Sequence, residues 1–75
     1  MSKNNLTCLQ EGESAKVVSL LNTGTIKRRL QDLGLVEGTQ VQCIQKSPWG
    51  DPVAYGIRGA VIAIRTEDAQ GILIN

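Results

Sequence analysis

The sequence predicts a mainly β protein, a small antiparallel β-barrel of about five strands with one short α-helix inserted after the first strand. Two observations support this fold class. The 41% apolar content is almost entirely aliphatic, with no Phe, one Trp and one Tyr, which favours short β-branched strands over a large aromatic pocket. Apolar and polar residues also alternate in short segments separated by glycines, and a closed or nearly closed barrel would leave few strand edges exposed.

The N-terminal part is expected to contain a tail, a turn and the first strand. A chain of 75 residues has room for one domain, which we expect to span residues 6–75, while the polar residues 1–5 form a disordered tail. Leu6 and Leu9 precede a glycine, which predicts a tight turn that plugs one end of the core. Residues 14–21 are expected to form the first strand, although both of its faces are apolar.

A short amphipathic helix is expected to follow and to end at Leu33. Ile26, Leu30 and Leu33 fall at i, i+4 and i+7, so they share one face, which we expect to pack against the barrel. Arg29 lies at the border of that face, where its aliphatic stem can cover the core. An N-cap is expected at Thr23 or Thr25.

Glycines mark the ends of several expected elements. Gly34 follows the helix, where it can take the left-handed conformation at little cost while Leu35 folds back as a hydrophobic contact. Gly38 opens the second strand, and Gly59 turns the chain between two later strands. The residues expected to be structural are therefore Leu30, Leu33, Gly34, Gly38 and Gly59.

The second half of the chain has the clearest strand pattern. Val53, Tyr55 and Ile57 alternate with smaller residues, as in a strand with one buried face. The other elements expected here are a strand over 39–46 with Val41 and Cys43 on one face, a proline-braced hairpin tip over 47–52, a strand over 60–65, a capped turn over 66–69 and a last strand over 72–75.

Two ordered blocks of sequence resemble a known family. LQDLGLVEGTQV and SPWGDPVAYGIRGAVIAIR are similar to the RL-x-x-LG-h-x-x-G-x-x-h and P-x-GDP-h-x-h-x-h-RG-x-x-h-x-h-R segments of the ferrous-iron transport protein A (FeoA) family, in which h is apolar. The resemblance covers nearly the whole chain. It implies an SH3-like barrel and an accessory role in ferrous-iron uptake, with the large membrane GTPase permease of that system, FeoB, as the partner.

Composition argues against several classes of function. The chain has no His, which excludes Ser-His-Asp and Cys-His catalysis, and its glycines form no nucleotide-binding motif. Its net charge of +1 is far below what a dedicated nucleic-acid binder needs. Cys8 and Cys43 lack the spacing of a zinc site, so we expect two free, mostly buried thiols, with a disulfide as the alternative.

The same residues predict no cofactor and no tight metal site. Isolated thiols and exposed acids are poor ligands for Fe²⁺, although a weak carboxylate site for a transition metal stays open. No stretch approaches the roughly 20 apolar residues of a membrane span, and the first residues contain no apolar leader region. We therefore expect a cytoplasmic protein that meets the membrane only through its partner.

Two surface features are candidate partner-binding sites. Lys27 and Arg28 belong to a basic run in the helix, which is either a solvated face or a docking surface for an acidic partner. Trp49 lies at the expected hairpin tip beside Asp51 and Pro52. Its indole is either a lid over the barrel end or an aromatic anchor for a partner.

The resemblance to the FeoA family implies a protein that binds the cytoplasmic region of the FeoB permease and could modulate it, and the missing catalytic residues favour one without enzymatic activity. The alternative is a freestanding regulatory domain, like the C-terminal domain of metal-dependent repressors, that binds a transition metal or a proline-rich peptide. A small RNA-binding barrel is disfavoured by the near-neutral charge and the single Trp.

Overall fold

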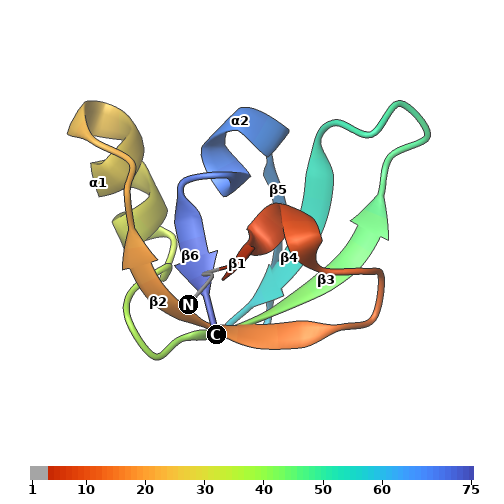
Figure 1. Ribbon diagram of the computed structural model, residues 1–75, viewed down its shortest axis with the longest axis horizontal. Coiled ribbons are helices and arrows are strands. Elements are labelled where there is room, and N and C mark those ends of the chain that lie inside the picture. The colour runs from red at the N-terminus through yellow and green to blue at the C-terminus, as the bar shows by residue number, and fades with distance from the viewer. Residues whose placement is uncertain (1–3) are drawn as a thin grey trace.

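The computed structural model describes residues 4–75, which form a single antiparallel sheet wrapped around one core (Figure 1). The elements in chain order are β1 (Asn4–Asn5), the 3₁₀ turn η1 (Leu6–Cys8), β2 (Ser14–Leu20), α1 (Gly24–Asp32), β3 (Gln40–Lys46), β4 (Val53–Ile57), β5 (Ala60–Ile64), α2 (Thr66–Ala69) and β6 (Ile72–Ile74). The strand order is β1-β6-β2-β3-β4-β5. The predicted mainly β fold is confirmed, with six strands among the described residues and a sheet that is not closed.

The expected tail over residues 1–5 is wrong for its last two residues. Asn4 and Asn5 pair with Ile74 and Leu73 and so add the short strand β1 to the edge of β6. Backbone pairing needs no apolar side chain, and the Asn5 Oδ1 also accepts a hydrogen bond from the backbone N–H of Thr7 at 2.9 Å. Residues 1–3 of the expected tail lie outside the described residues.

The core is formed by the residues that the alternating pattern predicts. Val53, Tyr55 and Ile57 of β4 are all buried, and so are Val41 and Cys43 of β3. The turn η1 plugs one end of this core as expected: Leu6 is fully buried, and the Tyr55 hydroxyl donates a hydrogen bond to its carbonyl oxygen at 3.3 Å.

The C-terminus of α1 follows the predicted glycine cap. Gly34 has a φ of 105°, its N–H bonds the Gln31 carbonyl at 3.0 Å, and the Leu35 N–H bonds the Leu30 carbonyl at 2.9 Å. Leu35 is fully buried beneath the helix end. The N-terminus differs in part from the expectation, because Thr23 holds the N-cap position but its side chain makes no capping hydrogen bond.

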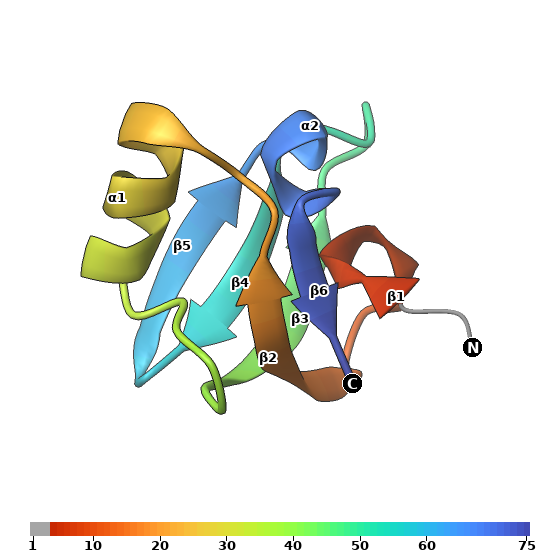
Figure 2. The same cartoon turned by 60° about the vertical axis from the view of Figure 1, so that its left-hand side comes forward.

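The predicted buried face of the helix is only partly correct. Leu30 is 4% exposed, whereas Ile26 is 37% exposed and Leu33 is partly buried. The helix lies beside β5 rather than over the middle of the core (Figure 2). Of the predicted apolar face, only Leu30 therefore reaches the core, while Ile26 and Leu33 face a groove between α1 and β5.

Two further predicted turn glycines have left-handed backbones. Gly38 has a φ of 89° and donates its N–H to the Val17 carbonyl at 2.8 Å, which links the start of β3 to β2. Arg58 and Gly59, with φ of 51° and 84°, form the two-residue turn between β4 and β5. No helix among residues 4–75 is both long enough and apolar enough to cross a membrane.

Candidate functional site

The hairpin tip between β3 and β4 presents Trp49 to solvent. The side chain is 89% exposed, so it lies outside the core and does not cover the barrel end. The tip begins with a tight turn in which the Gly50 N–H donates to the Ser47 carbonyl at 2.9 Å. An aromatic anchor must be accessible to a partner, and the Trp49 side chain is accessible. That Trp49 anchors a partner stays a prediction.

Asp51 ties the tip to the body of the molecule. Its Oδ1 accepts a hydrogen bond from the backbone N–H of Thr66 at 2.8 Å, and the Thr66 hydroxyl donates to the Gly50 carbonyl at 3.2 Å. Thr66 is the first residue of α2, where a backbone N–H has no partner within the helix. The carboxylate proposed for partner binding therefore serves as the cap of α2.

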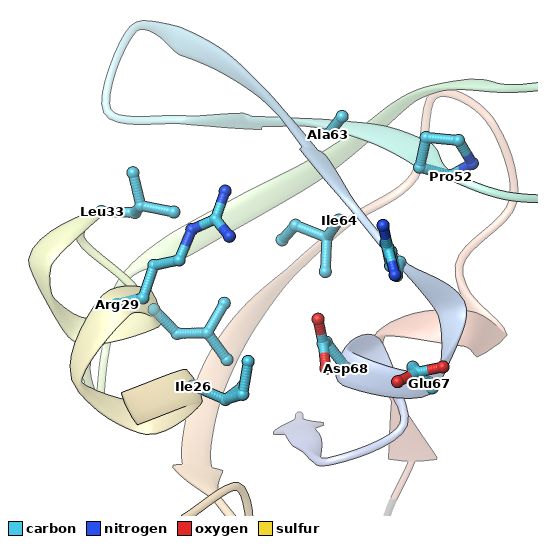
Figure 3. A pocket seen from close by; sticks show the side chains of 10 residues that line it. Ile26, Arg29, Leu33, Pro52, Ala63, Ile64, Glu67 and Asp68 are labelled. Carbon is cyan, nitrogen blue, oxygen red and sulfur yellow. The ribbon is translucent and has the colours of Figure 1, made fainter. Parts of the chain in front are cut away.

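A groove lies between α1 and β5, with α2 at one end (Figure 3). Its volume is about 500 Å³, within the range of ligand-binding clefts. Leu30 and Ile64 are its most buried residues. The full lining consists of Ile26, Arg29, Leu30, Leu33, Pro52, Ala63, Ile64, Arg65, Glu67 and Asp68.

The groove carries charges of both signs. Figure 3 shows the Arg29 side chain extending from α1 toward β5, and Asp68 on α2 at the other end. None of the side-chain hydrogen bonds found in residues 4–75 uses the guanidinium of Arg29 or Arg65. An apolar floor with charged groups at its rim is suited to recognition of a polypeptide segment.

The structure brings only part of the predicted partner-binding set together. Pro52 lines the groove, and Trp49 and Asp51 lie on the hairpin tip that leads to it. Lys27 and Arg28 are exposed on α1 and do not line the groove. Figure 1 shows that α1 and the hairpin tip lie on opposite sides of α2.

Several groove residues were not identified as site residues from the sequence. Arg65 falls at the end of the predicted strand over 60–65, and Glu67 and Asp68 fall in the predicted capped turn over 66–69. Local patterns could not reveal the groove, because its walls come from segments about 30 residues apart whose proximity depends on where α1 packs. The one sequence feature that pointed to this site is the uncharged strand that ends just before Arg65, because an uncharged strand at a sheet edge is open to pairing.

The cysteines match the expectation in one respect only. Both are free, but Cys8 is exposed whereas Cys43 is buried, so the expectation of two mostly buried thiols is wrong for Cys8. Cys8 is the last residue of η1, which buries Leu6 instead. Burial raises the pKa of the Cys43 thiol, with nearby Lys46 opposing the shift.

Metal coordination would need several donor side chains in one place. Within the described residues, no group of three or more His, Cys, Asp or Glu side chains comes close enough to hold a metal ion. The absence of a tight transition-metal site stays a prediction.

An antiparallel sheet of this topology, wrapped around one small core with short helices beside its edges, defines a small SH3-like domain protein. Sequence comparison refines this class, because the FeoA domain family matches residues 4–75. The chain belongs to the FeoA family, whose role is accessory to ferrous-iron transport.

The most informative relative is a fusion protein. The chain is 33% identical over 67 residues to the Fe(2+) transport protein A/Fe(2+) transporter FeoB fusion protein of Porphyromonas gingivalis. These residues are 89% of this chain but only 8% of that protein, so the chain spans a small part of its relative. In that relative, a domain of this family is joined to FeoB in a single polypeptide.

Solved structures of FeoA proteins have the same fold. FeoA from Chlorobium tepidum aligns with a TM-score of 0.91 at 33% identity, over 96% of this chain and 69% of that chain. FeoA from Stenotrophomonas maltophilia, solved in complex with zinc, aligns with a TM-score of 0.85 at 29% identity, over 96% of this chain and 89% of that chain.

The resemblance to metal-dependent repressors is one of fold alone. A manganese-dependent transcriptional repressor aligns with a TM-score of 0.84 over 96% of this chain and 40% of that chain, at 14% identity. Function cannot be transferred across a shared small barrel at this identity.

Proposed function

We propose that this protein is an accessory protein of ferrous-iron uptake that binds the cytoplasmic region of a FeoB permease and modulates it. It acts in the cytoplasm, has no enzymatic activity of its own and reaches the membrane only through this partner. The observation that carries the proposal is the relative in which the same domain is fused to FeoB.

Whether the domain is fused to its partner determines how strongly its own surface must bind, because fusion raises the effective concentration of the partner. A domain that is linked covalently to its partner meets it at a high local concentration, so weak contacts are sufficient. A domain on a separate chain must supply the affinity through its own surface. Such a surface should contain a large side chain that gains from leaving water.

Trp49 is the strongest candidate for that side chain. It is 89% exposed, and tryptophan is among the residues most enriched at the energetic centres of interfaces. The Asp51–Thr66 hydrogen bond holds the tip against α2, which reduces the entropy lost when a partner immobilises it. Trp49 and Pro52 thus form the contact surface, while Asp51 positions them.

Lys27 and Arg28 have a different role in this proposal. Both are exposed on α1, where charges mainly accelerate the encounter with an acidic surface and are screened by salt. They should therefore affect the association rate more than the lifetime of the complex.

The proposal is tested by titrating the purified protein with the purified cytoplasmic region of the FeoB permease from the same genome. Isothermal calorimetry should show saturable binding, and the GTP hydrolysis rate of the permease region should be followed in the same mixtures. A protein that shows no saturable binding at high concentrations of both components would contradict the proposal.

A further inference from the structure

The outer edge of β5 is unusual for an exposed strand. β5 pairs with β4 on one side and is the last strand of the sheet order, so its other edge has no strand partner within residues 4–75. Its sequence, AVIAI, contains no charge and no proline, although these are the usual means by which edge strands avoid pairing. An uncharged free edge of this kind is a template for one more strand.

The turn geometry identifies the backbone groups at this edge. The two-residue turn of Arg58 and Gly59 joins Ile57 and Ala60, which must exchange both of their hydrogen bonds. Because hydrogen-bonded and non-hydrogen-bonded pairs alternate along an antiparallel ladder, the next residues with N–H and C=O groups directed away from β4 are 61 and 63.

The groove borders the C-terminal part of this edge, at Ala63 and Ile64, and does not extend to Val61. Ala63 is one of its lining residues, and α1 forms the opposite wall with Leu30 and Leu33 (Figure 3). A segment that bonds to the backbone of Ala63 would therefore place alternate side chains on the apolar floor. The volume of about 500 Å³ suits a short extended segment.

The charges at the rim specify the chemistry of the occupant. Arg29 enters the groove from α1 and makes no side-chain hydrogen bond within residues 4–75, so its fork of donors is available to a carboxylate. Glu67 and Asp68 lie at the α2 end and outnumber Arg65, which also lines the groove there, so this end carries the opposite net charge.

We propose that the groove between α1 and β5 binds an extended segment of the permease partner, which pairs with β5 as an added strand. The segment carries an acidic side chain opposite Arg29 and a basic side chain opposite Asp68. The identity of the partner rests on the proposed function, whereas the mode of binding follows from the free edge and the groove.

A second copy of this chain fits the groove less well. Pairing of β5 with its counterpart would bring a whole sheet and a second α1 toward an edge that α1 already borders (Figure 2). The groove is bounded on both sides, so a single extended strand can enter where a sheet cannot.

The test compares the affinity of the permease's cytoplasmic region for wild type, Ala63→Pro and Ala63→Ser. Proline removes the outward N–H without touching the bonds to β4, and it is tolerated where the N–H of an edge strand faces away from the sheet. Serine is the matched control, because it keeps the N–H. We expect Ala63→Pro to weaken binding by about tenfold or more and Ala63→Ser to change it little.

A second pair of variants keeps the proposal falsifiable if the proline destabilises the fold. Arg29→Glu reverses a charge inside the groove, and Lys16→Glu reverses an exposed charge on β2, outside it. We expect about tenfold faster dissociation for Arg29→Glu and no change in dissociation for Lys16→Glu.

The outcomes separate this proposal from the proposed function. If wild type binds the permease and neither Ala63→Pro nor Arg29→Glu weakens the complex, the groove proposal is overturned and the proposed function stands. If wild type does not bind at all, both are overturned. If sedimentation shows a wild-type dimer that Ala63→Pro dissociates, the edge serves self-association and the groove proposal is again wrong.

Discussion

Asp51 shows how one side chain can organise two parts of this small molecule. Its carboxylate caps the first turn of α2 through the Thr66 N–H, and the same bond anchors the tip that carries Trp49. The N-cap residue of α2 itself, Arg65, makes no side-chain capping bond. The cap is supplied from 15 residues earlier in the chain, so a local capping rule could not have found it.

Asp51→Ala should lower the free energy of unfolding by about 1 kcal/mol, because it leaves the Thr66 N–H without its partner. Asp51→Asn retains an acceptor oxygen and should cost less. Urea denaturation of the three proteins measures both differences. Equal stabilities for wild type and Asp51→Ala would show that the bond contributes nothing.

Gly34 and Gly38 both have left-handed backbones but different surroundings. A Cβ on Gly38 would meet nothing within 4 Å, whereas one on Gly34 would lie 3.2 Å from the Arg58 Cδ. We expect Gly38→Ala to cost about 1 kcal/mol through the backbone alone and Gly34→Ala to cost at least as much. A neutral or stabilising Gly34→Ala in chemical denaturation would refute the glycine cap.

Tyr55 makes the stability depend on pH at the alkaline end. Burial, followed by the charge of Cys43, raises the pKa of its phenol to about 12, above the ordinary value of about 10. Above pH ~10 the unfolded chain therefore binds fewer protons than the native one. The contribution of Tyr55 to the free energy of unfolding is fully present below that pH and is lost as pH rises toward about 12.

The phenolate absorbance reports this directly, because Tyr55 is the only tyrosine of the chain. The native protein should titrate near 12 and the urea-unfolded protein near its ordinary value of about 10. Tyr55→Phe should flatten the fall in stability between these pH values, apart from the contribution of the Cys43 thiol, whose pKa is also raised. A native midpoint near that of the unfolded chain would contradict the burial argument.

At the scale of elements, α1 is attached through a narrow contact. Leu30 is 4% exposed, but Ile26 on the same predicted stripe is 37% exposed and faces the groove. The helix therefore has one residue in the core and leaves the rest of its apolar stripe available beside β5. The prediction of a fully packed apolar face was wrong because the sheet of residues 4–75 is not closed and α1 lies beside its edge strand β5 (Figure 2).

Leu30→Ala should cost about 2 to 5 kcal/mol, because it removes transfer free energy and leaves a cavity in a small core. Ile26→Ala is the matched control and should cost clearly less, since its side chain is already 37% exposed. Thermal and chemical denaturation of both variants would measure the contrast. A loss below about 0.5 kcal/mol for Leu30→Ala would mean that the helix does not pack through this residue.

Strand patterns were readable where one face is buried and the other is not. The alternation in β4 predicted Val53, Tyr55 and Ile57 as core residues, and all three are buried. The register shift after Cys43 was not predictable, because a bulge depends on the partner strand. Ile44, which lies at this shift, is 41% exposed.

At the scale of the whole molecule, the sequence predicted the fold better than the site. Turn glycines and alternating strand patterns are local signals, and they were enough to predict a small antiparallel fold. The sheet topology and the match to the FeoA family confirm this fold. The groove depends on where α1 packs beside β5, and this is a long-range property. Trp49 was recognisable as a candidate, but only the structure shows that its indole lies outside the core.

The central claim is that Trp49 serves binding and not the core. It is tested by measuring, for wild type and Trp49→Ala, both the affinity for the permease's cytoplasmic region and the free energy of unfolding. We expect affinity to fall by roughly 2 kcal/mol, chiefly through faster dissociation, while stability changes by less than about 0.5 kcal/mol. Charge reversal at Lys27 and Arg28 is the comparison, and should slow association in a salt-dependent way. If Trp49→Ala instead lowers stability and leaves affinity intact, the indole is a core lid and the account is wrong.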